Sequence, residues 1–565
     1  EMVEEAEVPA RWADITVEAE KVDENLPKWI KNIQIPVNSM KGDNIPVSEF
    51  MDLPDGTMPQ GTSKYEKRGI AVNVPVWNSE KCIQCNMCSY VCPHACIRPF
   101  LATEDEAKNA PEGFTMVQAK GKGMENYQYR IQTSVLDCTG CGSCVNVCPA
   151  KEKAITMEPL DAHRDQAENW EYALSLSPKK NPLGTSTVKG SQFEQPLLEF
   201  PGACPGCGET PYAKLITQLF GDRMYIANAT GCSSIWANSS PSTPYTTNKK
   251  GQGPAWSNSL FEDAAEFGYG MLLAQRAIRD RLKNELDEIA ANTDKADVKD
   301  AIKEWNDTFA SGIENGPATE KLVAALEACG CDASKNVLKE KDFLAKKSQW
   351  VFGGDGWAYD IGFGGVDHVL ASGKDINVMV FDTEVYSNTG GQSSKATPTG
   401  AIAQFAAGGK ETKKKDLAGI AMSYGYVYVA HISMGADMNQ CVKALAEAEA
   451  YPGPSLIIAY APCINHGIKK GMSKAQTEEK LAVESGYWFN FRYNPALAAE
   501  GKDAFSLDSK EPTGDYQAFL KGENRYASLA KFNPERAAEL FAASEQNSKD
   551  RYEHLKKLVT LYAGK

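Results

Sequence analysis

Eight of the sixteen cysteines lie in two short runs of matching spacing. In each run three cysteines are separated by two residues, and a fourth follows after three more and precedes a proline. Three thiolates in one such loop can bind three irons of a cubane, and we expect the fourth to start a helix that carries it toward the other cubane. The spacing predicts two 4Fe–4S clusters, bound by Cys82, Cys85, Cys88 and Cys148 and by Cys138, Cys141, Cys144 and Cys92.

A pair of zinc sites is the alternative for these eight cysteines. Zinc sites use Cys-x2-Cys pairs separated by longer loops, whereas both runs here end in Cys-Pro at the same spacing. The pattern therefore favours iron–sulfur clusters. Because the cysteines are clustered rather than spread like a secreted disulfide framework, we also expect a reducing, cytoplasmic environment.

A further Cys-x2-Cys turn, Cys204-Pro-Gly-Cys207, precedes a predicted helix. Alone it could be a redox dithiol or half of a zinc site. Cys232 and Cys463 each follow a predicted strand, and such strand ends lie at one edge of a parallel sheet. The four thiolates could therefore bind a third cluster, but nothing local connects Cys463 to the others, and the spacing leaves these interpretations open. Cys329, Cys331 and Cys441 lie in predicted helices and are interpreted as structural or incidental.

Gly353-Gly354-Asp355-Gly356 follows an apolar predicted strand and precedes a possible helix. Glycines allow close approach of a phosphate, and a helix N-terminus favours its negative charge. Asp355 is placed to bind a hard cation such as Mg²⁺. A Rossmann dinucleotide site is disfavoured, because no Gly-x-Gly-x-x-Gly follows the first strand. Since Cys232 and Cys463 also follow strands, we expect a diphosphate site and the third cluster to be neighbours.

The elements that must position these residues are indicated by apolar periodicity. Between residues 200 and 485, short apolar runs alternate with helical segments, which is typical of an α/β domain with a parallel sheet. The predicted strands are residues 224–227, 349–352, 377–381, 426–430 and 455–459. The predicted organisation is an extended segment (1–75), an α+β cysteine-rich domain (76–160), a linker (161–199), the α/β domain (200–485) with a helical insertion (271–348), and a C-terminal segment (486–565).

Composition excludes several other classes of protein. The net charge of −14 argues against nucleic-acid binding, which needs a basic surface. No run of 18 apolar residues occurs, so we expect no membrane span. The acidic N-terminus is unlike a secretory signal, and because it does not begin with Met we expect a processed chain or a piece of a longer one.

The glycine motif and the end of the next strand together resemble the thiamin diphosphate motif, in which Asn-Asn follows Gly-Asp-Gly. Here Asp382-Thr383 occupies the Asn-Asn positions, which is a departure from that motif. The resemblance implies that Asp355, Thr383 and the carbonyl of Val385 hold Mg²⁺. It leaves Asn388 free to reach the diphosphate or the reacting centre.

The whole chain resembles the C-terminal half of the pyruvate:ferredoxin oxidoreductase family. The stretches that carry this resemblance are Cys82–Pro99, Cys138–Pro149, Cys204–Thr210, Gly353–His368, Asp382–Pro398 and Ala461–His466. It implies a ferredoxin-like dicluster domain, a thiamin diphosphate-binding domain, and a third cluster on Cys204, Cys207, Cys232 and Cys463 beside the thiamin. It also implies thiamin contacts from Glu209, Cys232, Gly354, Asp355, Gly356, Trp357, Thr383, Glu384, Val385, Tyr386, Ser387 and Asn388, with Asn388 supporting catalysis.

The activity that the resemblance implies is oxidative decarboxylation of pyruvate with coenzyme A to acetyl-CoA and CO2. Electrons would pass through three clusters to ferredoxin or flavodoxin, and the complete enzyme would be a homodimer. The Glu that activates thiamin and the residues that bind substrate and coenzyme A would come from an N-terminal half. The alternatives are an enzyme for another 2-oxo acid and a non-catalytic electron-transfer subunit. The latter would predict a degenerate thiamin motif, whereas Asp355, Thr383 and Asn388 are present.

His466, beside Cys463, has two interpretations. It could donate a proton, because histidine titrates near neutral pH, or it could hold a residue that contacts the cofactor. A structural histidine whose hydrogen bonds are satisfied is the favoured interpretation.

Overall fold

The computed structural model describes residues 22–238 and 242–564, and the chain divides into two units, Glu1–Pro59 and Gln60–Lys565. The described part of the first unit consists of short helical turns: η2 (Ile30–Gln34), α1 (Ile35–Asn38), η3 (Gly42–Asn44) and η4 (Val47–Phe50). Ile30 and Ile33 are buried, and Trp29 packs edge-to-face on Phe50 at a centroid distance of 6.1 Å.

The second unit is built around one eight-stranded sheet. Its strands are β6 (Met224–Ala229), β7 (Ala255–Ser259), β8 (Ser348–Gly354), β9 (Asn377–Asp382), β10 (Tyr428–Ile432), β11 (Ser455–Tyr460), β12 (Phe491–Tyr493) and β13 (Phe505–Leu507). The order is β13-β12-β10-β11-β9-β8-β6-β7, with parallel pairing from β10 to β7 and antiparallel pairing of β12 and β13. The predicted α/β fold with a parallel sheet is therefore confirmed.

The sequence patterns do not predict β7, β12 and β13. Ala255–Ser259 is mostly polar and only partly buried, so it lacks the apolar run that marks the central strands. Phe491–Tyr493 and Phe505–Leu507 have three residues each, too short for a period to be recognised.

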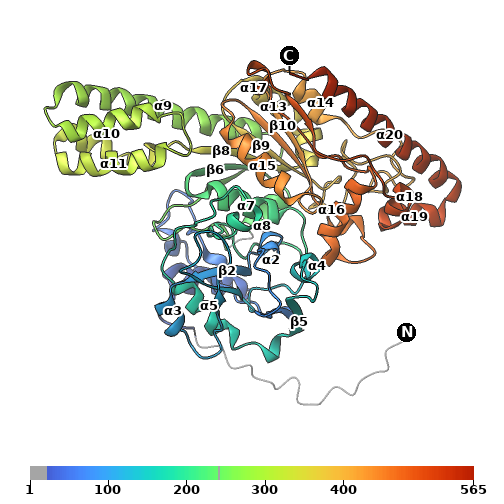
Figure 1. The fold of residues 1–565 in the computed structure, drawn as a ribbon, viewed down its shortest axis with the longest axis horizontal. Helices are drawn as coiled ribbons and strands as arrows, with labels where there is room; N and C mark the ends of the chain where they lie inside the picture. Colours follow the sequence, from blue (N-terminus) through green and yellow to red (C-terminus); the bar gives the residue numbers. More distant parts are fainter. Residues whose placement is uncertain (1–21, 239–241, 565) are drawn as a thin grey trace. The chain divides into compact units, whose positions relative to one another are not determined.

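Helices cover both faces of this sheet (Figure 1). Neighbouring residues of a strand point to opposite faces, and in the central strands the residues on both faces are buried. In β8, Val351 joins a core with α9 (Ala264–Asn292), α13 (Phe363–Ala371), α14 (Leu417–Met422) and α20 (Pro534–Leu561). Its neighbours Trp350 and Phe352 join a core with α7 (Thr210–Phe220), α8 (Cys232–Ala237) and α15 (Met438–Ala450). Sequence runs that are apolar at every position thus become strands buried on both sides.

The C-terminal part of α9 leaves the sheet and packs with three further helices, α10 (Ala296–Asp307), α11 (Asn315–Cys329) and α12 (Asp332–Leu338). Their core is separate from those of the sheet and centres on the buried side chains of Trp305, Leu282 and Leu322. Figure 1 shows α10 and α11 beside this part of α9. Helices α10, α11 and α12 lie within residues 271–348, the range predicted for a helical insertion, whereas α9 begins before it at Ala264.

The cysteine-rich region contains a two-stranded sheet and a three-stranded sheet, both antiparallel. They consist of β1 (Asn73–Trp77) with β5 (Ile155–Pro159), and of β2 (Ile97–Ala102), β4 (Gln128–Thr133) and β3 (Val117–Gln118). The short helices α2 (Met87–Tyr90) and α4 (Ser143–Val147) precede Cys92 and Cys148. The fourth cysteine of each run therefore follows a helix rather than starting one, since a residue before proline is disfavoured in helical conformation.

The remaining elements connect these parts or pack against them. They are η5 (Thr62–Tyr65), α3 (Glu104–Lys108), η6 (Leu160–Ala162), α5 (Gln166–Ser175), α6 (Val188–Ser191), η7 (Gly221–Arg223), η8 (Lys341–Phe343), η9 (Gly356–Ile361), η10 (Ile464–His466), η11 (Met472–Lys474), α16 (Ala475–Glu484), α17 (Ala496–Ala499), α18 (Tyr516–Lys521) and α19 (Asn524–Phe532). No helix in the described residues combines the length and apolar character needed to cross a membrane.

Candidate functional site

The two cysteine runs exchange their fourth members in space. Burial raises the pKa of the Cys85 and Cys88 thiols, and the neighbouring thiols of Cys82 and Cys148 raise it further. Cys148 comes from the second run, so the structure places it beside the first three. This is the set that the spacing predicts for one cluster.

The second set shows the reciprocal arrangement. Burial raises the pKa of the Cys138 thiol to about 12, and Cys92 of the first run contributes to the rise. Burial and Cys92 also raise the pKa of Cys141 and Cys144. These four thiols line a small cavity together with Pro93 and His94. A thiol-lined cavity suits iron, because bound metal ions would stabilise thiolates that burial alone disfavours.

The third set is assembled from three distant segments. Cys207 lies before α7, Cys232 begins α8 after β6, and Cys463 follows β11. Burial raises the pKa of the Cys207 and Cys232 thiols. The nearby Glu209 and Cys463 raise the pKa of both thiols further. Burial, Glu209 and the exposed Cys204 raise the pKa of Cys463 to about 11.

The Cys204–Cys207 turn, which carries two cysteines of the third set, contacts Cys141 of the second set. Burial and Cys92 raise the pKa of Cys141, and hydrogen bonds, one of them from the Gly206 backbone, oppose this rise. Gly206 lies in the Cys204–Cys207 turn at φ +79, where glycine avoids the strain that other residues meet. No three His, Cys, Asp or Glu side chains of the described residues converge closely enough to hold a single metal ion.

The predicted Mg²⁺ ligands converge at the ends of β8 and β9. The Thr383 hydroxyl lies 3.0 Å from both the Asp355 Oδ1 and the Val385 carbonyl oxygen. The Thr383 amide donates to the same carboxylate oxygen at 3.2 Å, and the Ser394 hydroxyl donates to Asp355 Oδ2 at 2.6 Å. A carboxylate, a hydroxyl and a backbone carbonyl oxygen thus lie close together, and oxygens are the ligands that a hard cation prefers.

Electrostatics at this point favour a bound cation. Asp355 and Asp382 are fully buried. Burial raises the pKa of Asp355 well above its usual value, and the nearby Asp382 carboxylate raises it further. A divalent cation would offset both effects, because it favours the ionised carboxylate. The residues present therefore fit Mg²⁺.

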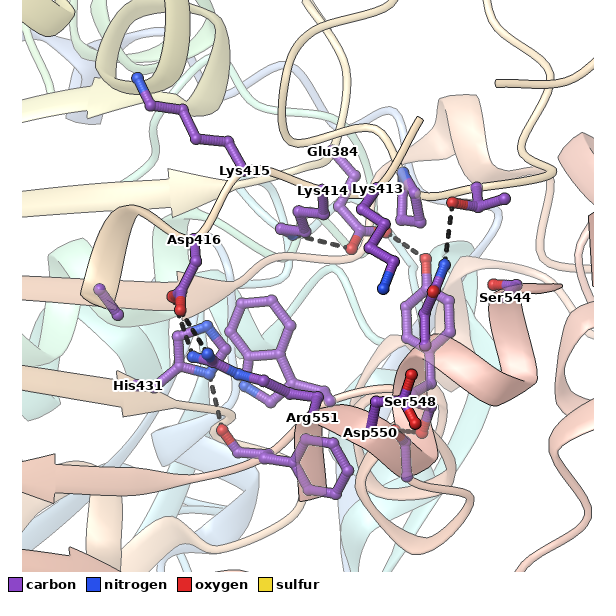
Figure 2. A pocket seen from close by; sticks show the side chains of 18 of the residues that line it. Glu384, Lys413, Lys414, Lys415, Asp416, His431, Ser544, Ser548, Asp550 and Arg551 are labelled. Carbon is purple, nitrogen blue, oxygen red and sulfur yellow. Dashed lines mark hydrogen bonds and ion pairs between the residues drawn. The ribbon is translucent and has the colours of Figure 1, made fainter. Parts of the chain in front are cut away.

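A buried ion network lies beside these ligands, and sequence reasoning missed it. Lys414 Nζ lies 2.8 Å from Asp382 Oδ2 and 2.9 Å from Glu384 Oε1, and Arg525 lies 2.8 Å from Glu384 Oε2. Although burial opposes ionisation, Lys414 and Arg525 lower the pKa of Glu384 to about 2. Figure 2 shows Lys414 against Glu384 in a cavity of about 390 Å³. Glu384, predicted to contact thiamin, thus has its carboxylate engaged by these cations.

Glu384 also has a left-handed backbone at φ +60, a strained conformation for a non-glycine residue. Its side chain forms the ion pairs with Lys414 and Arg525. The preceding Thr383 and the following Val385 are the predicted Mg²⁺ ligands. The network therefore lies at the turn that presents them.

His466 links the third thiol set to the same turn. It is fully buried, and its Nε2 donates to the Thr383 carbonyl oxygen at 2.7 Å. Its Nδ1 lies 3.6 Å from Glu523 Oε1. These contacts connect the segment that carries Cys463 to the turn that carries Thr383.

The other residues predicted to bind the cofactor lie around this turn. The Ser387 hydroxyl donates to Cys232 Sγ at 3.1 Å, which joins the turn to the third thiol set. A Cβ on Gly356 would lie 2.5 Å from the Tyr386 ring, so the glycine is required for close packing. Trp357 is buried, and its indole N–H has no hydrogen-bond partner among the described residues. Asn388 is exposed.

Glu209 and Gly354 complete the predicted set. Glu209 is buried beside the third thiol set and accepts a hydrogen bond from Trp236 Nε1 at 2.7 Å. Burial raises its pKa to about 7, and the Trp236 bond opposes this rise. Gly354 ends β8 directly before Asp355.

Comparison with known proteins assigns two of these regions to families. Residues 328–459 match the model of the thiamine pyrophosphate enzyme, C-terminal TPP binding domain, and residues 78–151 match the 4Fe-4S dicluster domain. Residues 16–71 match a domain of unknown function. The two named domains contain, respectively, Asp355 with Thr383 and both cysteine runs.

Relatives match the chain over almost its full length. It is 57% identical to a pyruvate-flavodoxin oxidoreductase of Enterobacter agglomerans and 56% identical to a pyruvate:ferredoxin oxidoreductase of Moorella thermoacetica, in each case over 99% of this chain and 48% of the relative. It is 46% identical to a mitochondrial pyruvate dehydrogenase [NADP(+)] of Euglena gracilis, over 99% of this chain and 31% of the relative. The chain thus spans about half the length of the first two relatives, or less for the third. The predicted resemblance is confirmed: over nearly its whole length this chain is similar to pyruvate-flavodoxin and pyruvate:ferredoxin oxidoreductases.

Proposed function

We propose that this chain forms the thiamin diphosphate–Mg²⁺ site and the electron-transfer part of a pyruvate oxidoreductase. The reaction is oxidative decarboxylation of pyruvate with coenzyme A to acetyl-CoA and CO2, with ferredoxin or flavodoxin as electron acceptor. One observation carries the proposal: the turn that holds Thr383 and Val385 touches the third thiol set through Ser387 and Cys232. A cofactor held by that turn and a cluster on those cysteines would be neighbours.

The residues of the turn have separate tasks. Asp355, Thr383 and the Val385 carbonyl would hold Mg²⁺, and the cation would bind the diphosphate. Gly354 and Gly356 flank Asp355, and Gly356 lets the Tyr386 ring pack closely beside it. Thiamin diphosphate, when bound, supplies the electron sink that decarboxylation of a 2-oxo acid requires.

The cysteine sets are arranged in a continuous order. The third set, Cys204, Cys207, Cys232 and Cys463, lies between the Ser387 contact and the Gly206 contact to Cys141. The second set adjoins the first, because burial and neighbouring thiols that include Cys88 raise the pKa of Cys144. The three sets therefore form a path from the turn, through the third and second sets, to the first set. A 4Fe–4S cluster on each set would accept one electron at a time.

The remaining parts of the proposed enzyme lie outside this chain. The residue that activates thiamin, the pyruvate contacts and the coenzyme A contacts are assigned to an N-terminal half, and the complete enzyme is proposed to be a homodimer. The proposed location is the cytoplasm. An enzyme for another 2-oxo acid is the second candidate, since substrate contacts would lie partly in the other half.

Binding of thiamin diphosphate tests the part of the proposal that belongs to this chain. The anaerobically purified chain, with iron bound, is titrated with thiamin diphosphate in the presence and absence of Mg²⁺ by calorimetry. We expect Mg²⁺-dependent binding. Absence of binding by the iron-loaded, folded chain would contradict the catalytic proposal and favour a non-catalytic electron-transfer subunit.

The activity itself is tested on the complete assembly. Reduction of a viologen dye is measured with pyruvate and coenzyme A, and 2-oxoglutarate is compared with pyruvate at equal concentration. We expect dye reduction to depend on pyruvate and on coenzyme A. A preference for 2-oxoglutarate would instead support the second candidate.

A further inference from the structure

Two cysteines outside the three thiol sets lie next to each other at a helix junction. Cys329 is the last residue of α11, and Cys331 is the N-cap residue of α12. Their sulfur atoms are 3.5 Å apart. Cys331 is exposed and Cys329 is partly exposed, so both can meet a solute.

The surroundings of Cys331 favour a reactive thiolate. Its sulfur lies 3.1 Å from the Ser334 hydroxyl and 3.5 Å from the Ser334 backbone nitrogen, which donates to it. These hydrogen bonds, the one from the Ser334 side chain first, lower the pKa of Cys331 to about 7. The fully buried Cys441 differs, because burial raises the pKa of its thiol. Cys331 therefore combines access with thiolate character, the two requirements for exchange with a disulfide.

We propose that Cys329 and Cys331 form a dithiol site that is reversibly oxidised by low-molecular-weight disulfides such as glutathione disulfide. The Cys331 thiolate attacks one sulfur of the small disulfide, a mixed disulfide forms, and one small thiolate leaves. The Cys329 thiol loses its proton to solvent and its sulfur attacks Cys331 Sγ, so that a Cys329–Cys331 disulfide forms and the second small thiolate leaves. The pair loses two electrons and two protons, and the small disulfide is reduced to two thiols.

The backbone between the two cysteines permits this closure. A disulfide has a sulfur–sulfur length of about 2.05 Å, so the sulfurs must approach by roughly 1.5 Å. Gly330 has φ +66, and a Cβ there would meet no atom closer than 4.0 Å. The junction is thus formed by the residue with the greatest backbone freedom, in uncrowded surroundings. Formation of the disulfide would move Cys331 Sγ away from its two contacts with Ser334. The N-cap hydrogen bond at the start of α12 would then be lost.

Mass spectrometry of the whole chain tests the proposal. The iron-loaded protein is incubated anaerobically with glutathione disulfide, alkylated, unfolded and digested with trypsin, which places both cysteines in one peptide, residues 322–335. We expect this peptide to lose both alkylatable thiols and two hydrogen atoms, and dithiothreitol to restore them. The Cys441 peptide should stay unchanged. Persistence of two free thiols, or accumulation of a mixed disulfide that does not close, would overturn the proposal.

Variants separate the two thiols. In Cys329→Ser the reaction should stop at the mixed disulfide on Cys331, because the second thiol is missing. Ser334→Ala should slow alkylation of Cys331 at pH 7 by roughly twofold to fivefold, since loss of the hydroxyl contact raises the pKa and the lower thiolate fraction is partly offset by greater nucleophilicity. An unchanged rate in Ser334→Ala would contradict the assigned role of Ser334. Dye reduction by the complete assembly should be unaffected in both variants.

Discussion

Asp355 is the residue on which the proposed Mg²⁺ site depends most. Its carboxylate is fully buried and accepts hydrogen bonds from Thr383 and Ser394. Such a group is costly to ionise in a protein interior unless a positive charge lies beside it. The residue is thus better suited to hold a cation than to strengthen the core.

Replacement of Asp355 by Asn tests this role. Asp355→Asn keeps the size of the side chain and removes its charge, so we expect Mg²⁺-dependent affinity for thiamin diphosphate to fall roughly tenfold or more. The measurement is calorimetric titration of the iron-loaded chain. Asp375→Asn is the matched control, because Asp375 forms a partly exposed ion pair with Lys346. Equal affinity of Asp355→Asn and wild type would rule out Asp355 as a ligand.

Between elements, the stability of the site depends on the loop that carries Lys414 and on the end of β9. Lys414 is the cation shared by Asp382 and Glu384. A buried charge that loses its partner costs about 3–5 kcal/mol, more than the pair itself contributes. A substitution of Lys414 should therefore lower the free energy of unfolding by more than its partly exposed position suggests.

Lys414→Met removes this shared cation while it keeps an apolar stem. We expect the free energy of unfolding to fall by about 3–5 kcal/mol, because the buried Asp382 carboxylate loses its cation and Glu384 keeps only Arg525. Urea denaturation monitored by circular dichroism measures it. The control is Lys413→Met, because Lys413 is the exposed neighbour of Lys414. We expect its free energy of unfolding to change by no more than about 0.5 kcal/mol. Equal effects of the two substitutions would contradict the argument.

Glu479 of α16 connects that helix to α7 and to the loop after β10. Its Oε2 accepts from the Gly435 amide at 2.7 Å and from the Tyr212 hydroxyl at 3.1 Å. Burial raises its pKa from 4.5 to about 8, although these hydrogen bonds oppose the rise. The folded chain therefore keeps a proton that the unfolded chain loses above pH 4.5.

This difference predicts a pH dependence of stability. Between about pH 4.5 and pH 8 the unfolded state binds fewer protons, so the contribution of Glu479 to stability falls as the pH rises. In Glu479→Gln that contribution is absent, and we expect a shallower loss, with a difference of about 4 kcal/mol accumulated over this range. Denaturation midpoints at several pH values, compared with wild type, measure it. Parallel profiles would show that Glu479 is ionised in the folded chain.

At the scale of the whole molecule, the chain brings segments hundreds of residues apart to one edge of a sheet. Cys232 follows β6 and Cys463 follows β11, two strands that are not neighbours in the sheet order. Their thiols nevertheless interact, with Glu209 and Cys207 close by. A site of this kind exists only when the complete sheet is formed.

Cys463→Ser tests whether the third set binds a cluster. Wild type should contain about twelve irons per chain, and the variant about eight, because a hydroxyl is a poor ligand for iron–sulfur clusters. Iron analysis of anaerobically purified protein measures the difference. Cys441→Ser is the control, since Cys441 is fully buried and belongs to none of the three sets. Full iron content in Cys463→Ser would remove that residue from the ligand set.

The sequence by itself determined the features that depend on local spacing. The two cysteine runs, the Cys204–Cys207 turn and the glycine motif around Asp355 could be recognised because the chemistry requires those residue types at short intervals. The parallel sheet was also predictable, since strands buried on both faces are apolar at every position. In contrast, β12 and β13 are too short to carry a recognisable period.

Only the tertiary structure decided which distant residues meet. Lys414 and Arg525 are ordinary charged residues in the sequence, and their ionic contacts with Glu384 follow from packing of the chain around β9. His466 contacts Thr383 for the same reason. Such contacts join residues that no local pattern connects, because burial and charge compensation act through space and not along the chain.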